Sequence, residues 1–118
     1  MLPFFLSFIG CNRFDEQLLV GKWQASAITE DGQVVDIDYS PVNFEFTNSG
    51  NYTFNSTIEY KEAGSYYVSG DLLFTTDTLN TASTEKAVQI ANLTQDSLKL
   101  IMEANGKPKV MELYKLDR

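Results

Sequence analysis

Histidine is absent from this 118-residue sequence, cysteine occurs once and proline three times. Without histidine, the Ser-His and Cys-His forms of nucleophilic catalysis are excluded, as are histidine-based metal sites. The lone thiol of Cys11 excludes an intramolecular disulfide. The most apolar segment, residues 2–9, is far shorter than the ~20 residues that a membrane-spanning helix needs. The fold must therefore rest on one hydrophobic core, which a domain of this length can supply.

Basic residues are also scarce, with nine Lys and Arg against sixteen Asp and Glu, and the net charge is −7. They are scattered singly, so the basic patch that binds phosphate backbones is missing, and we expect no nucleic-acid partner. The segment that begins at Asp36 resembles a calcium loop, but Pro41 stands where that loop requires glycine. Glutamates that could form catalytic pairs alternate with apolar neighbours, as an outward polar face does: Glu45, Glu59, Glu103 and Glu112. We therefore expect no catalytic site, no metal and no cofactor.

Aromatic residues are plentiful, with eight Phe, six Tyr and one Trp, and they favour strands over helices. The clearest alternation places Val42, Phe44 and Phe46 on one face of a strand. The chain predicts an all-β fold, a small eight-stranded antiparallel up-and-down barrel with one or two helical turns in residues 14–19. The expected strands are residues 21–30, 42–47, 52–60, 65–68, 72–76, 84–93, 97–103 and 110–116, with local pairing at 33–37.

Glycine and asparagine mark the expected turns between these strands. Asp31-Gly32 and Asn105-Gly106 are the strongest hairpin signals, because glycine adopts positive φ at no steric cost. Residues 61–64 also contain a glycine among polar neighbours, and we expect a turn there.

The interior of an eight-stranded barrel is just wide enough to be filled by side chains or to hold one small ligand. Gly21 and Trp23 at the head of the first strand are expected to plug one end. Alternation points nine residues inward as the candidate lining of a cavity: Phe44, Phe46, Phe54, Ser56, Ile58, Val88, Ile90, Leu98 and Leu100. Ser56, a small residue among large ones, fits either a cavity or the taper of a filled barrel.

The beginning of the chain is uncharged and apolar up to Gly10, and polar sequence follows Cys11 at once. A secretory signal peptide has such a short apolar region and ends in small residues. The pattern resembles the lipobox of bacterial lipoproteins, which implies removal of residues 1–10 and lipidation of Cys11. Residues 11–17 would then form the lipid-anchored tether. A start assigned too far downstream would explain why no Lys or Arg precedes the apolar region.

Ordered motifs along residues 18–118 resemble the lipocalin-like domain of small lipoproteins from Gram-negative bacteria. They are Gly21-x-Trp23, Phe44-x-Phe46 followed by Gly50-x-Tyr52, Gly64-x-Tyr66-x-Val68-x-Gly70-Asp71, Leu98-x-Leu100 and Glu112-Leu113-Tyr114. The resemblance implies a monomeric lipoprotein of the cell envelope, on the periplasmic or surface face of the outer membrane, whose barrel binds a small apolar or amphipathic ligand.

One alternative to a ligand-binding barrel stays open at this stage, and two hydroxyl side chains are candidates for modification. A filled barrel could instead bind another envelope protein through its rim loops, of which residues 77–83 form the longest polar connection. Thr78 and Ser97 each follow Asp and precede Leu, which resembles the acceptor of O-glycosylation on exported proteins in some Gram-negative bacteria.

Overall fold

The computed structural model describes residues 14–57, 59–80 and 84–116. A single 3₁₀ turn, η1 (Glu16–Leu19), precedes nine strands. The strands are β1 (Gly21–Glu30), β2 (Gln33–Val34), β3 (Asn43–Phe46), β4 (Asn51–Asn55), β5 (Lys61–Ser69), β6 (Leu72–Asp77), β7 (Glu85–Leu93), β8 (Ser97–Ala104) and β9 (Lys107–Lys115). Within these residues, no helix is both long and apolar enough to cross a membrane.

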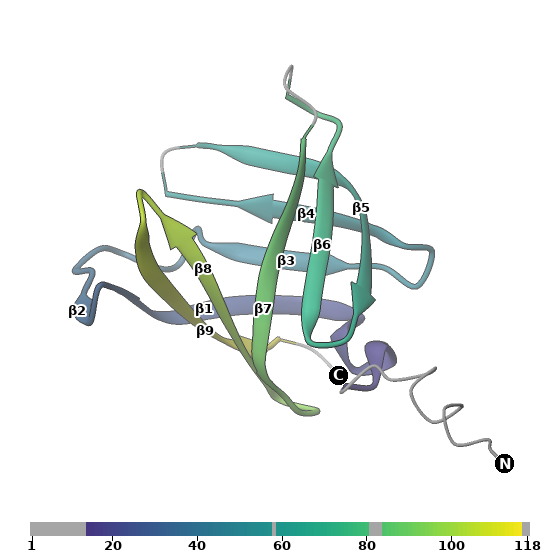
Figure 1. Ribbon diagram of the computed structural model, residues 1–118, viewed down its shortest axis with the longest axis horizontal. Coiled ribbons are helices and arrows are strands. Elements are labelled where there is room, and N and C mark those ends of the chain that lie inside the picture. Colours follow the sequence, from purple (N-terminus) through teal and green to yellow (C-terminus); the bar gives the residue numbers. More distant parts are fainter. Residues whose placement is uncertain (1–13, 58, 81–83, 117–118) are drawn as a thin grey trace, which may run out of the picture.

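Eight of the strands form one closed antiparallel barrel (Figure 1). Each strand from β3 to β9 pairs with the next along the chain, and β1 closes the sheet by pairing with β3 and with β9. The closing ladder runs from Trp23 opposite Lys115 to Glu30 opposite Lys109, with a bulge between Ala25 and Ala27. The two-residue strand β2 pairs with the last two residues of β1 and is not one of the eight barrel strands. The predicted eight-stranded barrel with a short N-terminal helix is confirmed.

The hairpin signals act as expected at two turns. Asp31 and Gly32 have φ of 53° and 80°, and Asn105 and Gly106 have φ of 58° and 77°. The left-handed conformation at both positions is that of type I′ turns, whose twist matches the twist of the flanking strands.

The predicted turn at residues 61–64 is wrong. β4 ends at Asn55, and the chain turns earlier, where the Ser56 amide donates to the Tyr60 carbonyl at 2.9 Å. Gly64 lies inside β5, at a point where the β6 backbone comes close. A Cβ atom on Gly64 would lie 1.9 Å from the Thr76 carbonyl oxygen, so this glycine is needed for close packing of two strands.

The up-and-down order places alternate connections at opposite ends of the barrel (Figure 1). We call the end that η1 covers the closed end; the β3–β4, β5–β6 and β7–β8 hairpins also lie there. The Asp15 carboxylate caps η1 by accepting from the Gln17 amide at 3.0 Å. At the other end, the open end, lie the connections β1–β3, β4–β5, β6–β7 and β8–β9. The two ends of the barrel interior differ in how they are filled.

Candidate functional site

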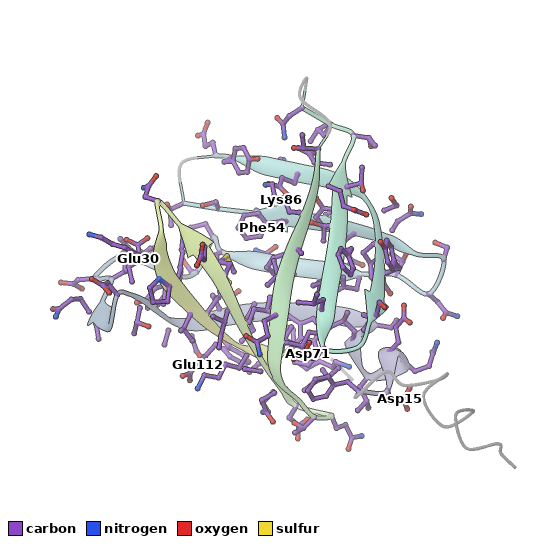
Figure 2. All side chains as sticks on the ribbon, viewed as in Figure 1. Asp15, Glu30, Phe54, Asp71, Lys86 and Glu112 are labelled. Carbon is purple, nitrogen blue, oxygen red and sulfur yellow. The ribbon has the colours of Figure 1, made fainter. Side chains whose placement is uncertain are left out.

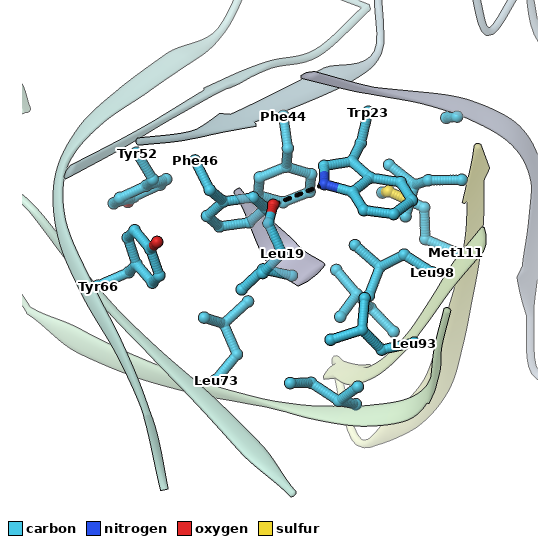
Figure 3. Packing of buried hydrophobic residues seen from close by; sticks show 14 of the residues in the cluster. Leu19, Trp23, Phe44, Phe46, Tyr52, Tyr66, Leu73, Leu93, Leu98 and Met111 are labelled. Atoms are coloured by element: carbon cyan, nitrogen blue, oxygen red, sulfur yellow. Dashed lines mark hydrogen bonds between the residues drawn. The ribbon is translucent and has the colours of Figure 1, made fainter. Parts of the chain in front are cut away.

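The closed end is packed solid around Trp23 (Figure 3). The Trp23 side chain is completely buried, and its indole Nε1 donates to the Leu19 carbonyl at 2.8 Å, which ties β1 to η1. The Lys115 ammonium lies 4.8 Å from the indole centroid and donates to the carbonyls of Leu18 and Val20 at 2.9 and 3.0 Å. Gly21 has φ of +137°, which side chains rarely allow, and a Cβ there would lie 3.2 Å from Lys115.

Three residues expected to line a cavity belong to this packed region instead. Phe46, Ile90 and Leu98 are each only 1% exposed and join the buried cluster. Phe46 on β3 lies opposite Gly21 on β1. The Ile90 amide donates to the carbonyl of Asp71 in the β5–β6 hairpin. Alternation correctly points these side chains inward, but it carries no information about their height along the barrel axis.

The open end holds a cavity of about 330 Å³. Five of the expected lining residues surround it: Phe44, Phe54, Ser56, Val88 and Leu100. Two other predicted residues lie outside the described residues: Ile58, expected in the cavity lining, and Cys11, the expected lipidation site. The other lining residues are Tyr60, Glu62, Leu73, Thr75, Lys86, Met102, Lys109 and Met111. The wall is mostly apolar, and its charged groups come from β5, β7 and β9.

The cavity has one buried charged group, the Glu62 carboxylate, which the sequence analysis missed. Glu62 is 6% exposed and accepts hydrogen bonds from three side chains. Tyr52 Oη donates to Oε1 at 2.7 Å, Tyr60 Oη donates to Oε2 at 2.7 Å, and Lys86 Nζ reaches Oε2 at 2.6 Å. The sequence does place Glu62 on the same strand face as Gly64, Tyr66 and Val68, which would have pointed it inward. Because residues 61–64 were predicted to be a turn, Glu62 was not assigned to that face.

These contacts keep the Glu62 carboxylate charged. Burial alone would raise its pKa, but the hydrogen bonds from Lys86, Tyr60 and Tyr52 outweigh burial and hold the pKa below its usual value of 4.5. The same carboxylate acts on its donors. The hydrogen bond to Glu62, aided by burial, raises the pKa of Tyr60 to about 12, and burial together with Glu62 raises the pKa of Tyr52. Both phenols therefore stay protonated as donors at neutral pH.

A second hollow of about 240 Å³ adjoins the cavity beneath the segment that carries β2. Phe54, Ser56, Lys109 and Met111 line both spaces. Four large apolar residues with substantial exposure lie in the connections at this same end: Val34, Ile37, Tyr60 and Leu79, at 73%, 40%, 39% and 58%. The open end thus combines an apolar interior with an apolar rim.

Thr78 and Ser97, the candidate glycosylation residues, lie at opposite ends of the barrel. Thr78 is exposed at the open end, and its hydroxyl donates to the Ala63 carbonyl at 3.2 Å. Ser97 is half-buried at the closed end, where its hydroxyl lies 2.8 Å from that of Thr94 and accepts from the Asn92 side chain at 3.2 Å. Both hydroxyls are therefore engaged in local hydrogen bonds.

The sequence profile of the lipocalin-like domain matches residues 19–100, which is more than half of the chain. This chain belongs to the lipocalin-like domain family. A lipocalin-like protein from Bacteroides uniformis has the same fold, with a TM-score of 0.63 and 18% identity, over 84% of this chain and 99% of the other. An uncharacterized protein from Bacteroides eggerthii is similar, with a TM-score of 0.60 and 17% identity over 83% and 99%. No curated protein is significantly similar in sequence to this lipocalin-like chain.

Proposed function

We propose that this lipocalin-like barrel is a monomeric binding protein, rather than an enzyme, and that it holds one small amphipathic molecule in its open-end cavity. The observation that supports the proposal most is the cavity itself. Its volume of about 330 Å³ lies at the lower end of the range of small-molecule sites. An apolar wall with a few fixed polar groups is the usual composition of such sites, since the wall supplies affinity and the polar groups orient the ligand.

The wall divides into an apolar floor and a charged side. Leu73, Leu100 and Phe44 form the floor, and each is at most 9% exposed. Glu62 and Lys86 mark the charged side, where the Lys86 side chain is still 51% exposed and so connects the cavity with solvent. A ligand with an apolar body and one polar end matches this division.

The proposal is tested by titrating the purified protein with a neutral, environment-sensitive apolar fluorophore. We expect saturable binding with one site per chain, and we expect the variant Ser56→Phe to weaken it because Ser56 lines both hollows. Ser65→Phe is the matched control, since Ser65 is exposed on β5 and lines neither hollow. Wild-type protein that binds no fluorophore, or equal binding by both variants, would rule out the cavity as the site.

We further propose that the barrel is anchored in the cell envelope through a lipid on Cys11. The support is the sequence pattern of residues 1–11, an apolar segment that ends in Gly10 before the lone cysteine. The protein should then partition with membranes, and Cys11→Ser should leave it unprocessed or soluble. A single acyl chain anchors only marginally, so mass spectrometry should find more than one chain on the cysteine. Unchanged membrane partition of Cys11→Ser would contradict the anchor.

A second candidate function is favoured by the exposed apolar side chains of the rim. Val34 and Leu79 are the most exposed of these, at 73% and 58%. They could contact another envelope protein. Cross-linking of such a protein by the wild type and by Ser56→Phe, but not by a Val34→Ser, Leu79→Ser double variant, would favour this function over ligand binding.

A further inference from the structure

Three charged side chains line the open-end cavity, and they differ in how completely they are satisfied. Glu62 lies on β5, Lys86 on β7 and Lys109 on β9. Lys86 and Phe54, both labelled in Figure 2, line the same cavity. The hydrogen-bonding capacity that remains on these groups defines which head group the cavity can accept.

The Glu62 carboxylate has little capacity left. Two phenols and one ammonium already donate to it, and a carboxylate has about four acceptor positions. It is also 6% exposed, so its bonds are shielded from water and costly to break. A ligand that donates hydrogen bonds would therefore find about one free acceptor position on Glu62, and further bonds would have to displace one of these three groups.

The two lysines, by contrast, retain free donors. Each ammonium carries three N–H groups. Within the described residues, Lys86 makes one hydrogen bond, to Glu62. Lys109 makes no side-chain hydrogen bond within the described residues. Its ammonium lies 3.7 Å from a carboxylate oxygen of Glu30, whose side chain is half-exposed. Among its charged side chains, the wall of the cavity therefore presents more free donors than free acceptors, and two positive charges against one negative charge.

We propose that the ligand is an amphiphile with an anionic head group, of which a medium-chain carboxylate is the simplest case. This inference rests on the proposed ligand-binding function. The head group accepts hydrogen bonds from Lys86 and Lys109, and the alkyl chain lies on the floor formed by Leu73, Leu100 and Phe44. Charge-assisted hydrogen bonds of this kind are stronger than neutral ones, so they fix the orientation of the ligand as well as its affinity.

Two further carboxylates lie near the cavity without lining it. Asp77 is 3% exposed and accepts from the amides of Ala63 and Leu79 and from the Asn80 side chain, so it is engaged in shaping the β6–β7 connection. Glu30 borders the neighbouring hollow and is partnered by Lys109. Three further glutamates are sequence neighbours of lining residues but are exposed and do not line the cavity, so their charges are weakened by solvent and salt: Glu59, Glu85 and Glu103. The groups in direct contact with the ligand thus decide its sign.

The test compares four compounds that carry a ten-carbon chain, by calorimetry below their micelle or solubility limits: decanoate, methyl decanoate, decanol and decylammonium. We expect decanoate to bind about tenfold or more tightly than the other three, the size of one charge-assisted hydrogen bond. Lys109→Met and Lys86→Met should each remove most of this preference while methyl decanoate binds as before. Lys109→Arg should retain it. Lys22→Met is the control, because it removes the same charge from an exposed position on β1 outside the cavity.

The outcomes separate this inference from the function on which it rests. Decanol and methyl decanoate binding as tightly as decanoate would leave the ligand-binding function intact and overturn the anionic head group. Tighter binding of decylammonium would also overturn it and assign the head-group site to Glu62. Failure of all four compounds and of the neutral fluorophore would overturn both. Lys109→Met leaves the Glu62 hydrogen bonds untouched, so a misfolded Lys86→Met variant would not spoil the test.

Discussion

Trp23→Ala is the substitution that most directly tests how the closed end is held together. It removes a completely buried indole, its hydrogen bond to the Leu19 carbonyl and the ring beneath the Lys115 ammonium. These three contacts join η1 to β1, and β1 to the end of β9, where the closing ladder reaches the closed end. The variant should therefore loosen both η1 and the ladder that closes the barrel.

The expected loss follows from the burial and the hydrogen bond. Replacing a buried large aromatic residue with alanine costs about 3–5 kcal/mol in unfolding free energy. The carbonyl of the fully buried Leu19 loses its side-chain donor, which adds about 1 kcal/mol. A total of roughly 4–6 kcal/mol is close to the whole net stability of many domains, which is about 5–15 kcal/mol. Trp23→Phe keeps much of the packing and should lose less.

Urea unfolding followed by far-ultraviolet circular dichroism measures the loss. Fluorescence is unsuitable, since the variant has no tryptophan left. The midpoint should fall with little change in the slope against denaturant concentration. Tyr67→Ala is the control: this aromatic residue is 49% exposed, stacks on Phe74 and makes one exposed hydrogen bond to Glu85, so its loss should stay below about 1 kcal/mol. A loss below about 2 kcal/mol for Trp23→Ala would refute the reasoning, because such a value is typical of ordinary substitutions.

Two further predictions concern the cavity side of the barrel. Gly64→Ala should destabilise the fold by about 3 kcal/mol or more, because the new Cβ would lie 1.9 Å from the Thr76 carbonyl oxygen. Gly32→Ala is the control: its Cβ would meet no atom within 4 Å, so it should cost only about 1 kcal/mol, through the positive φ of Gly32. Similar losses for both variants in urea unfolding would contradict this account of Gly64. The lowered pKa of Glu62 means that its hydrogen bonds stabilise the fold above the usual pKa of 4.5 and that this contribution disappears as pH falls through the lower folded value. Between about pH 5 and pH 3, the unfolding free energy of Glu62→Gln should therefore fall less steeply with falling pH than that of the wild type. Equal slopes for the two proteins would show that the folded state does not favour the charged form of Glu62.

The strands and most turns could be predicted from the sequence because they depend on local signals. Alternation in residues 42–47 and the Asn105-Gly106 dipeptide each determine the backbone conformation of a few neighbouring residues. The turn predicted at residues 61–64 failed for a non-local reason. Gly64 is required by the approach of Thr76, twelve residues away in sequence and on the next strand, and no pattern around Gly64 reports that contact.

The candidate site could be predicted only in part, for a related reason. Alternation gives the inward face of each strand, so Phe44, Phe54 and Val88 were found. It does not give the height along the barrel, so Phe46, which packs in the solid closed end, was included as well. Glu62 was missed because a carboxylate is stable inside a barrel only with donors. Its closest basic partner, Lys86, lies on β7, which is two strands away.

The position of η1 has a consequence for how the protein would stand on a membrane. The described chain enters the barrel at the closed end, at Phe14, only three residues after Cys11. Three residues span at most about 10 Å. A lipid on Cys11 would therefore hold the closed end against the head groups of the bilayer and turn the mouth of the cavity toward the aqueous compartment. Any molecule bound in the cavity would then exchange with that aqueous compartment rather than with the bilayer beneath the closed end.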